Sequence, residues 1–271
     1  MNTTADLERG HAAYSSSAWQ EAYASLSEAD RAVPLAAEDL ELLATSAYML
    51  GREDDWMRIL GRAFQRHSDD GVTLRAARCA FWIGMQLALR GEMGPATGWL
   101  GRAHRLVERE DRECAEQGYM LMPVSFQHEA AGDFEGAAAT AGAAAELGER
   151  FGDADLFALA VHVQGGLLVK CGRVGEGLAL LDEAMVTATA GELSPIVTGI
   201  VYCGVILACE EIYELRRAQE WTAVLARWCE QQPDLVAFTG RCLVHRAQLM
   251  HLRGIGGTHS KRRSAQVSVS S

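Results

Sequence analysis

The chain is poor in proline, in lysine and in long apolar runs. It has only five prolines in 271 residues, while alanine, leucine, glutamate and arginine are plentiful, so its composition favours helix. No alternating segment rich in valine and isoleucine lies between turn residues, which argues against a ladder of strands. The sequence therefore predicts an all-α fold.

Signals for secretion and membrane insertion are also missing. Residues 1–20 contain no apolar signal core, and charged residues break every apolar run before the ~20 residues that a membrane-spanning helix needs. The seven cysteines are odd in number and scattered, which is typical of buried free thiols in a reducing compartment. We expect a cytoplasmic protein without membrane association.

Positive charge is scarce, because only Lys170 and Lys261 are lysines and the formal net charge is −11. A chain with a net negative charge repels the phosphates of nucleic acids, so we do not expect this chain to bind nucleic acid directly. The basic triplet 261–263 lies near the end of the chain, and we interpret it as part of a solvated tail.

What the chain does contain is internal repetition with a period of about forty residues. Turn points that follow one helix-like run and precede another serve as anchors. They are Ser17, Gly51, Gly91, Gly132, Gly172, Tyr213 and Gly254, and they stand 34, 40, 41, 40, 41 and 41 residues apart. The spacing predicts a series of helix pairs, each with a turn at its anchor.

Mostly small residues stand at fixed distances from these anchors. Seven positions before them are Gly10, Ala44, Gly84, Ser125, Gly165 and Ala247. Five positions after them are Ala22, Trp56, Ala96, Ala137, Gly177 and Ala218, and twelve after them are Ala29, Ala63, Ala103, Ala144, Ala184 and Leu225. Residues five and twelve positions after an anchor are about two helical turns apart, so they lie on one stripe of the second helix. The residue nine positions after the anchor lies between them and is usually leucine. Such a stripe predicts two helices that approach closely.

This pattern resembles the tetratricopeptide repeat, which has small, bulky and small residues at the same spacing, as in Gly84, Ala96, Leu100 and Ala103. The resemblance covers roughly residues 5–254 and implies an all-α, TPR-like α-solenoid of about six antiparallel helix pairs. The forty-residue unit exceeds the family's thirty-four, which implies longer helices. We expect pairs at roughly 5–31, 36–68, 72–110, 113–150, 154–190 and 195–231.

The seventh unit is incomplete. Residues 235–253 predict a first helix, but the positions where a second helix needs small, bulky and small residues hold His259, Arg263 and Gln266. We therefore predict one domain at 5–254 and a disordered tail at 255–271. A lone last helix leaves apolar side chains uncovered, which predicts either dimerisation or instability through that end.

Two stretches, Trp19–Asp54 and Gly172–Glu210, resemble the helical-repeat region of actinobacterial LuxR-type transcriptional regulators. In that family the array precedes a C-terminal helix-turn-helix domain, and no comparable segment follows residue 254. The resemblance implies the sensor or scaffold part of a regulator without its DNA reader. A truncated gene, a frameshift or a naturally short protein would each explain this.

Sites for chemistry are not indicated. Cys242, His245 and His251 share a helix but lack a fourth ligand and paired cysteine spacing, so no metal site is expected. The glycines between Gly172 and Gly177 belong to a helix–helix turn without a preceding strand, so they do not predict a phosphate loop. We expect no cofactor and no enzymatic activity, because an all-helical enzyme would need a convergent polar cluster.

A binding surface is the better prediction, because the first helices of successive units line the concave side of a solenoid. Positions ten, six and three residues before each anchor form a stripe there. Its candidate contacts are Tyr48, Phe81, Met85, Met122, Phe126, Glu129 and His162. Either this stripe binds a protein partner or a small effector, or longer helices curl tightly and bury it. As a function, the sequence predicts a non-catalytic regulator scaffold or, alternatively, a stand-alone adaptor that tethers partner proteins.

Overall fold

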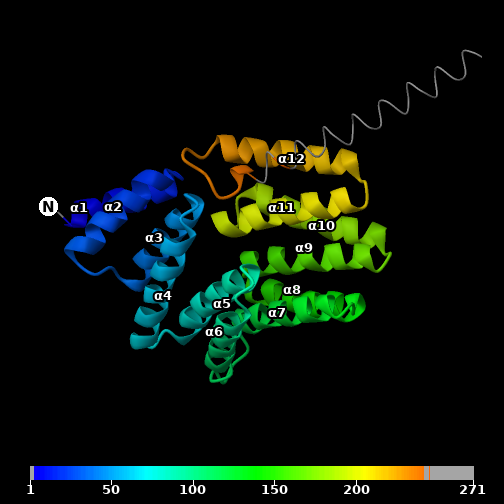
Figure 1. Cartoon of the computed structure of the whole chain (residues 1–271), viewed down its shortest axis with the longest axis horizontal. Helices are drawn as coiled ribbons and strands as arrows, with labels where there is room; N and C mark the ends of the chain where they lie inside the picture. The colour runs from blue at the N-terminus through cyan, green and yellow to red at the C-terminus, as the bar shows by residue number, and fades with distance from the viewer. Residues whose placement is uncertain (1–2, 241–243, 245–271) are drawn as a thin grey trace, which may run out of the picture.

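The computed structural model describes residues 3–240 and 244, and this part of the chain is entirely helical apart from its turns and connections. Within these residues twelve helices form six consecutive pairs, and Figure 1 shows how successive helices lie against one another. The pairs are α1 (Thr3–Ser15) with α2 (Trp19–Ala32), α3 (Ala37–Met49) with α4 (Glu53–Asp69), α5 (Thr73–Leu89) with α6 (Met93–Val107), α7 (Ala115–Ala130) with α8 (Phe134–Phe151), α9 (Ala154–Lys170) with α10 (Val174–Ala190), and α11 (Pro195–Glu211) with α12 (Leu215–Glu230). The six predicted pairs and the all-α solenoid are confirmed.

Each anchor within the described residues adopts a left-handed backbone conformation that ends the first helix of its pair. The φ angle is positive at Ser17, Gly51, Gly91, Gly132, Gly172 and Tyr213. At Gly51 the amide donates to Tyr48 O at 2.8 Å, and the Arg52 amide donates to Ala47 O at 2.9 Å. These bonds satisfy the last carbonyls of α3, and the chain then turns back into α4.

Small side chains let the two helices of a pair nest. A Cβ atom added to Gly84 of α5 would lie 2.7 Å from Leu100 Cγ of α6. In the fifth pair a Cβ on Gly177 would lie 2.5 Å from the carbonyl oxygen of Gly165. Ser125 takes the same position in α7 and donates a buried hydrogen bond of 2.8 Å to Ala137 O of α8. The phased small residues are therefore the contact points between paired helices.

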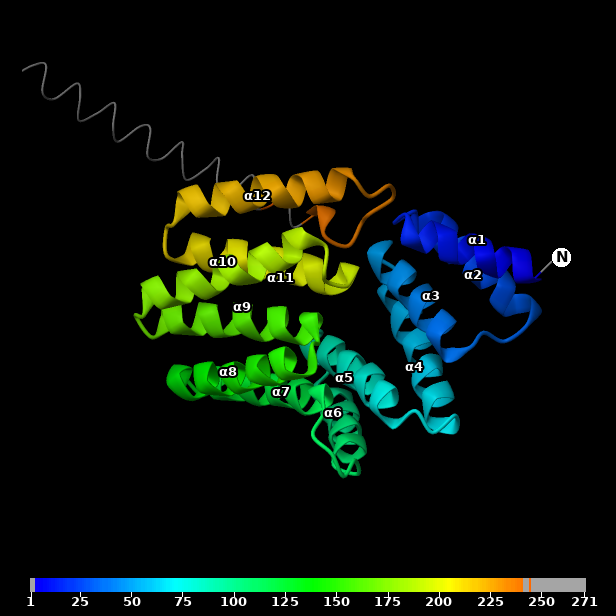
Figure 2. The same cartoon turned by 180° about the vertical axis from the view of Figure 1, so that it is seen from behind.

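The superhelix curls tightly enough for its sixth unit to meet its first two. Helices α3 and α11 are in contact, and Trp19 Nε1 of α2 donates to Gln232 Oε1 at 3.1 Å. The amide of Val236 donates to Met49 O at 2.9 Å. Figures 1 and 2 show the orange segment after α12 returning toward the blue N-terminal helices. The chain thus forms a nearly closed ring of helix pairs.

The segment after α12 differs from the prediction of a helix that begins at residue 235. Residues 235–238 form turns and irregular structure, and helix begins only at Thr239. Phe238 is buried between Tyr48 of α3 and Trp228 of α12, with ring centroids 6.0 and 5.9 Å away. From this irregular segment Phe238 links α3 to α12.

The remaining sequence predictions about the C-terminal end lie largely outside the described residues. These include the rest of the helix expected to residue 253, the domain boundary at 254 and the tail at 255–271. Dimerisation through this end also stays a prediction. In the part of the chain that the structure does cover, no helix has both the length and the apolar character needed to cross a bilayer.

Candidate functional site

The first helices of the pairs face the inside of the ring and line a partly open cavity of about 460 Å³. Helices α1, α3, α5, α7 and α9 contribute side chains to it, as do the start of α11 and part of α4. Its charged lining residues are Glu41, Arg75, Arg78, Glu116 and Asp155. The concave side therefore carries both signs of charge, although the chain as a whole is acidic.

Arg78 of α5 joins three neighbouring units at the wall of this cavity. Its Nη2 lies 2.6 Å from Glu116 Oε1 and 2.8 Å from Asp153 Oδ2, and its guanidinium lies over the Tyr119 ring at 4.8 Å. Burial alone would lower the pKa of Arg78, but Tyr119, Asp153 and Glu116 outweigh burial and raise it. Arg78 Nε remains buried without a hydrogen-bond partner among the described residues.

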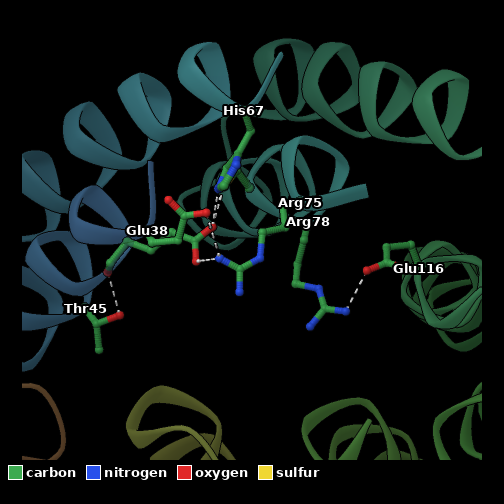
Figure 3. A network of polar contacts seen from close by, with 8 residues as sticks. Glu38, Thr45, His67, Arg75, Arg78 and Glu116 are labelled. Carbon is green, nitrogen blue, oxygen red and sulfur yellow. Dashed lines mark hydrogen bonds and ion pairs between the residues drawn. The ribbon is translucent and has the colours of Figure 1, made fainter. Parts of the chain in front are cut away.

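A second polar group forms where α3, α4 and α5 meet. His67 Nε2 lies 2.6 Å from Glu41 Oε1, and Cys79 Sγ lies 3.9 Å from the same oxygen. The other carboxylate oxygen of Glu41 lies 3.4 Å from Arg75 Nη1. Figure 3 shows His67 and Arg75 directed toward α3, while Arg78 extends toward Glu116. Burial, and next the Glu41 carboxylate, raise the pKa of the Cys79 thiol.

Asp155, near the start of α9, is a half-buried carboxylate on another part of the lining. Its Oδ1 accepts a hydrogen bond of 2.8 Å from the Ser194 amide, at the N-cap of α11. Burial raises the pKa of Asp155, although the hydrogen bond opposes this shift. Burial also raises the pKa of Tyr14, whose hydroxyl pairs with Thr45. Among the charged groups near Asp155, Asp153 raises its pKa and Arg78 lowers it, each less than burial does.

A second hollow of about 540 Å³ lies between the α1–α2 turn and helices α10 to α12. Arg227 is its one charged lining residue among those described, and small or polar side chains make up most of the rest. The Trp19–Gln232 hydrogen bond lies beside it. This hollow marks the seam where the ring closes, whereas the first cavity collects polar groups from many helices.

The seven residues predicted from the concave stripe do not line the 460 Å³ cavity. Phe81 and Met122 are buried, and Met85 is half-buried against the core. Tyr48 is half-buried and packs edge-on against Trp56 at 5.3 Å. Their role in binding stays a prediction.

The other three predicted residues lie farther along the superhelix. Phe126 is partly exposed, and Glu129 forms an ion pair of 2.7 Å with Lys170 of α9. His162 packs against Gly204 of α11, and its Nδ1 lies 3.2 Å from Ala158 O. Burial lowers the pKa of His162 to about 4. The structure therefore does not bring these three together with the polar groups of the cavity.

Sequence reasoning missed most of the cavity because the polar residues stand near the start of their helices. Arg75, Glu116 and Asp155 lie in the first turns of α5, α7 and α9, and Arg78 lies in the second turn of α5. Of the residues that line the cavity, only Tyr14, Glu41 and Thr45 stand at positions of the predicted stripe. A count of charged residues near the start of each first helix is the signal that would have found them.

Comparison with known proteins supports the fold. No known family model matches the sequence, and no curated protein matches it. A Rap protein complexed with competence and sporulation factor superposes with a TM-score of 0.55 at 16% identity, over 90% of this chain and 74% of that chain. PilF of Pseudomonas aeruginosa gives a TM-score of 0.45 at 14% identity, over 83% and 91% of the two chains.

The TPR domain of P58(IPK) gives a TM-score of 0.35 at 12% identity, over 99% of this chain and 70% of that one. The likeness to the Rap protein indicates a shared fold. Because the identity is only 16%, the likeness shows nothing about function. The chain thus has the fold of a TPR-like α-solenoid.

Proposed function

We propose that this chain is a non-catalytic sensor or scaffold module that binds a small effector, or a short peptide segment of a protein partner, inside its ring. The observation that carries the proposal is the cavity of about 460 Å³, lined by charged groups from α3, α5, α7 and α9. Ligand pockets of roughly 300–1,000 Å³ hold small molecules. The size therefore suits an effector or a few peptide residues rather than a folded partner.

The charges of the lining favour a ligand that carries both signs. Arg75 is about half exposed at the lining, whereas Nη2 of Arg78 is already paired with Glu116 and Asp153. An anionic group on the ligand would pair with the Arg75 guanidinium. The pKa of Asp155 is raised by burial, so an amino group on the ligand would stabilise its ionised form. A short peptide offers both groups on one flexible backbone.

The structural likeness supports this class of ligand without fixing its identity. The Rap protein that shares the fold was crystallised with competence and sporulation factor bound to it. Binding in this chain would act by changing the curvature of the ring, because the lining residues come from four or more units that must move together.

We further propose that the module belongs to a LuxR-type transcriptional regulator. This rests on the sequence resemblance of Trp19–Asp54 and Gly172–Glu210. A reading frame downstream that encodes a helix-turn-helix domain would support it. A gene that ends without such a frame would favour the alternative, a stand-alone adaptor.

Affinity selection from a synthetic library of short unmodified peptides tests the ligand proposal. Arg75→Gln removes one charge from the cavity, and Arg58→Gln removes the same charge from an exposed ion pair with Asp55 on α4. We expect wild type and Arg58→Gln to enrich the same peptides, with at least ten-fold weaker binding to Arg75→Gln. Equal enrichment by all three proteins, or none by wild type, would refute cavity binding.

A further inference from the structure

Three potential metal ligands from consecutive helices converge beside the cavity. They are Glu41 of α3, His67 of α4 and Cys79 of α5, and their ligand atoms all lie within 4.8 Å of one another. His67 and Cys79 are buried, with 1% and 3% of their surfaces exposed. We propose that Glu41, His67 and Cys79 form a zinc-binding site with one coordination position open to the cavity.

The three ligand atoms lie near enough together for a tetrahedral zinc site to form after a local adjustment. Zinc bonds of about 2.0–2.3 Å place neighbouring N and O ligands roughly 3.4 Å apart and neighbouring S and O ligands roughly 3.6 Å apart. Here His67 Nε2 and Glu41 Oε1 are 2.6 Å apart, and Cys79 Sγ and Glu41 Oε1 are 3.9 Å apart. Side-chain rotation of Glu41 that lengthens the first distance and shortens the second would accommodate the ion.

The donor types select for zinc over the hard cations. Thiolate and imidazole favour Zn²⁺, whereas Mg²⁺ and Ca²⁺ prefer sites made of oxygen atoms alone. One thiolate and one carboxylate also balance the two positive charges of the ion. Arg75 lies 3.4 Å from Glu41 Oε2, so it can orient the carboxylate from outside while Oε1 faces His67 and Cys79.

A structural alternative is that Glu41 merely satisfies a buried histidine. That explanation accounts for the His67 contact but not for the thiol directed at the same oxygen from a third helix. Glu41 and Cys79 line the cavity while His67 lies behind them. The open position would therefore face the cavity and take a water molecule or a donor atom of a bound ligand.

Metal uptake also has a defined proton balance. Burial raises the pKa of the Cys79 thiol, so the metal-free protein holds it protonated at neutral pH. Binding replaces the S–H bond with a Zn–S bond and releases that proton to solvent. The hydrogen that His67 Nε2 donates to Glu41 in the metal-free protein leaves Nε2, and the neutral ring then carries its hydrogen on Nδ1 while Nε2 coordinates. The oxidation states of sulfur and metal do not change.

Titration of the chelator-treated full chain with Co²⁺, followed by displacement with Zn²⁺, tests the site. We expect one equivalent of Co²⁺ to produce a thiolate charge-transfer band in the ultraviolet and strong visible bands of four-coordinate cobalt. Mg²⁺ should not compete. Cys79→Ser should abolish the charge-transfer band, and His67→Gln should weaken Co²⁺ binding at least ten-fold.

Cys171→Ser is the matched control, because this half-buried thiol lies in the α9–α10 turn away from the cluster. It should leave the titration unchanged. X-ray absorption of the zinc-loaded wild type should show one sulfur ligand. This measurement does not depend on any variant folding. A wild type without the charge-transfer band, or a folded Cys79→Ser variant that keeps it, would overturn the proposal. No cavity ligand enters these measurements, so their outcome is independent of the peptide selection.

Discussion

The tight contact between α9 and α10 offers a sharp test of how paired helices are held together. Gly177 of α10 faces Gly165 of α9, where an added Cβ would lie 2.5 Å from the Gly165 carbonyl oxygen and 3.0 Å from the Val169 amide nitrogen. Both obstructing atoms belong to the backbone, so no side-chain rotation can relieve the contact. Gly177→Ala therefore forces α9 and α10 apart.

Two opposing terms set the magnitude. Replacing a helical glycine with alanine gains roughly 0.5–1 kcal/mol, because alanine loses less conformational freedom on folding. Overpacking a tight contact costs about 1–3 kcal/mol. The overpacking term is the larger, so we expect Gly177→Ala to lower the free energy of unfolding by about 1–2 kcal/mol.

Gly98→Ala is the matched control, since Gly98 lies within α6 and nothing would come within 4 Å of its added Cβ. The same substitution there should raise the free energy of unfolding by about 0.5–1 kcal/mol. Urea denaturation followed by far-ultraviolet circular dichroism measures both. If the two variants change stability in the same direction, the argument that small residues set the helix spacing is wrong.

Two further predictions concern the closed ring. His162 has a pKa of about 4 in the folded chain against an ordinary 6.5, so the unfolded chain binds the proton more readily between these values. Stability should fall by up to about 3 kcal/mol as the pH is lowered from 6.5 to 4, and His162→Gln should remove that part of the slope in urea titrations across this range; an unchanged slope would contradict the assignment. Phe238→Ala should lower the free energy of unfolding by about 3 kcal/mol, because it empties a buried site between α3 and α12, while Leu89→Ala at a 79% exposed position should have little effect. Equal stabilities of these two variants, measured by urea denaturation, would show that Phe238 does not link the ends of the ring.

Much of the fold could be predicted because each unit repeats the same local pattern, a turn residue with small residues at fixed distances from it. Gly51, Gly91, Gly132 and Gly172 have the positive φ that a tight turn between helices requires, and their spacing alone located six helix pairs. The small residues at fixed offsets identified the packed face of each helix. Gly84 against Leu100 and Gly165 against Gly177 confirm that interpretation.

The candidate site could be predicted only in part, because it depends on how neighbouring units are rotated about one another. Glu41 was on the predicted stripe, but its partners His67 and Cys79 belong to other helices and share no sequence motif with it. Asp155 and Ser194 also belong to different units, and no sequence motif indicates that they form a hydrogen bond.

The sequence by itself determined the helices, their turns and the spacing within each pair, since these follow from glycine conformation and small side chains a few residues apart. The tertiary structure alone decided the curvature of the ring, its closure by Trp19 and Gln232, and the meeting of polar side chains inside it. Curvature is the sum of small rotations between successive units. Each rotation depends on packing between units, so no local pattern in the chain specifies the total.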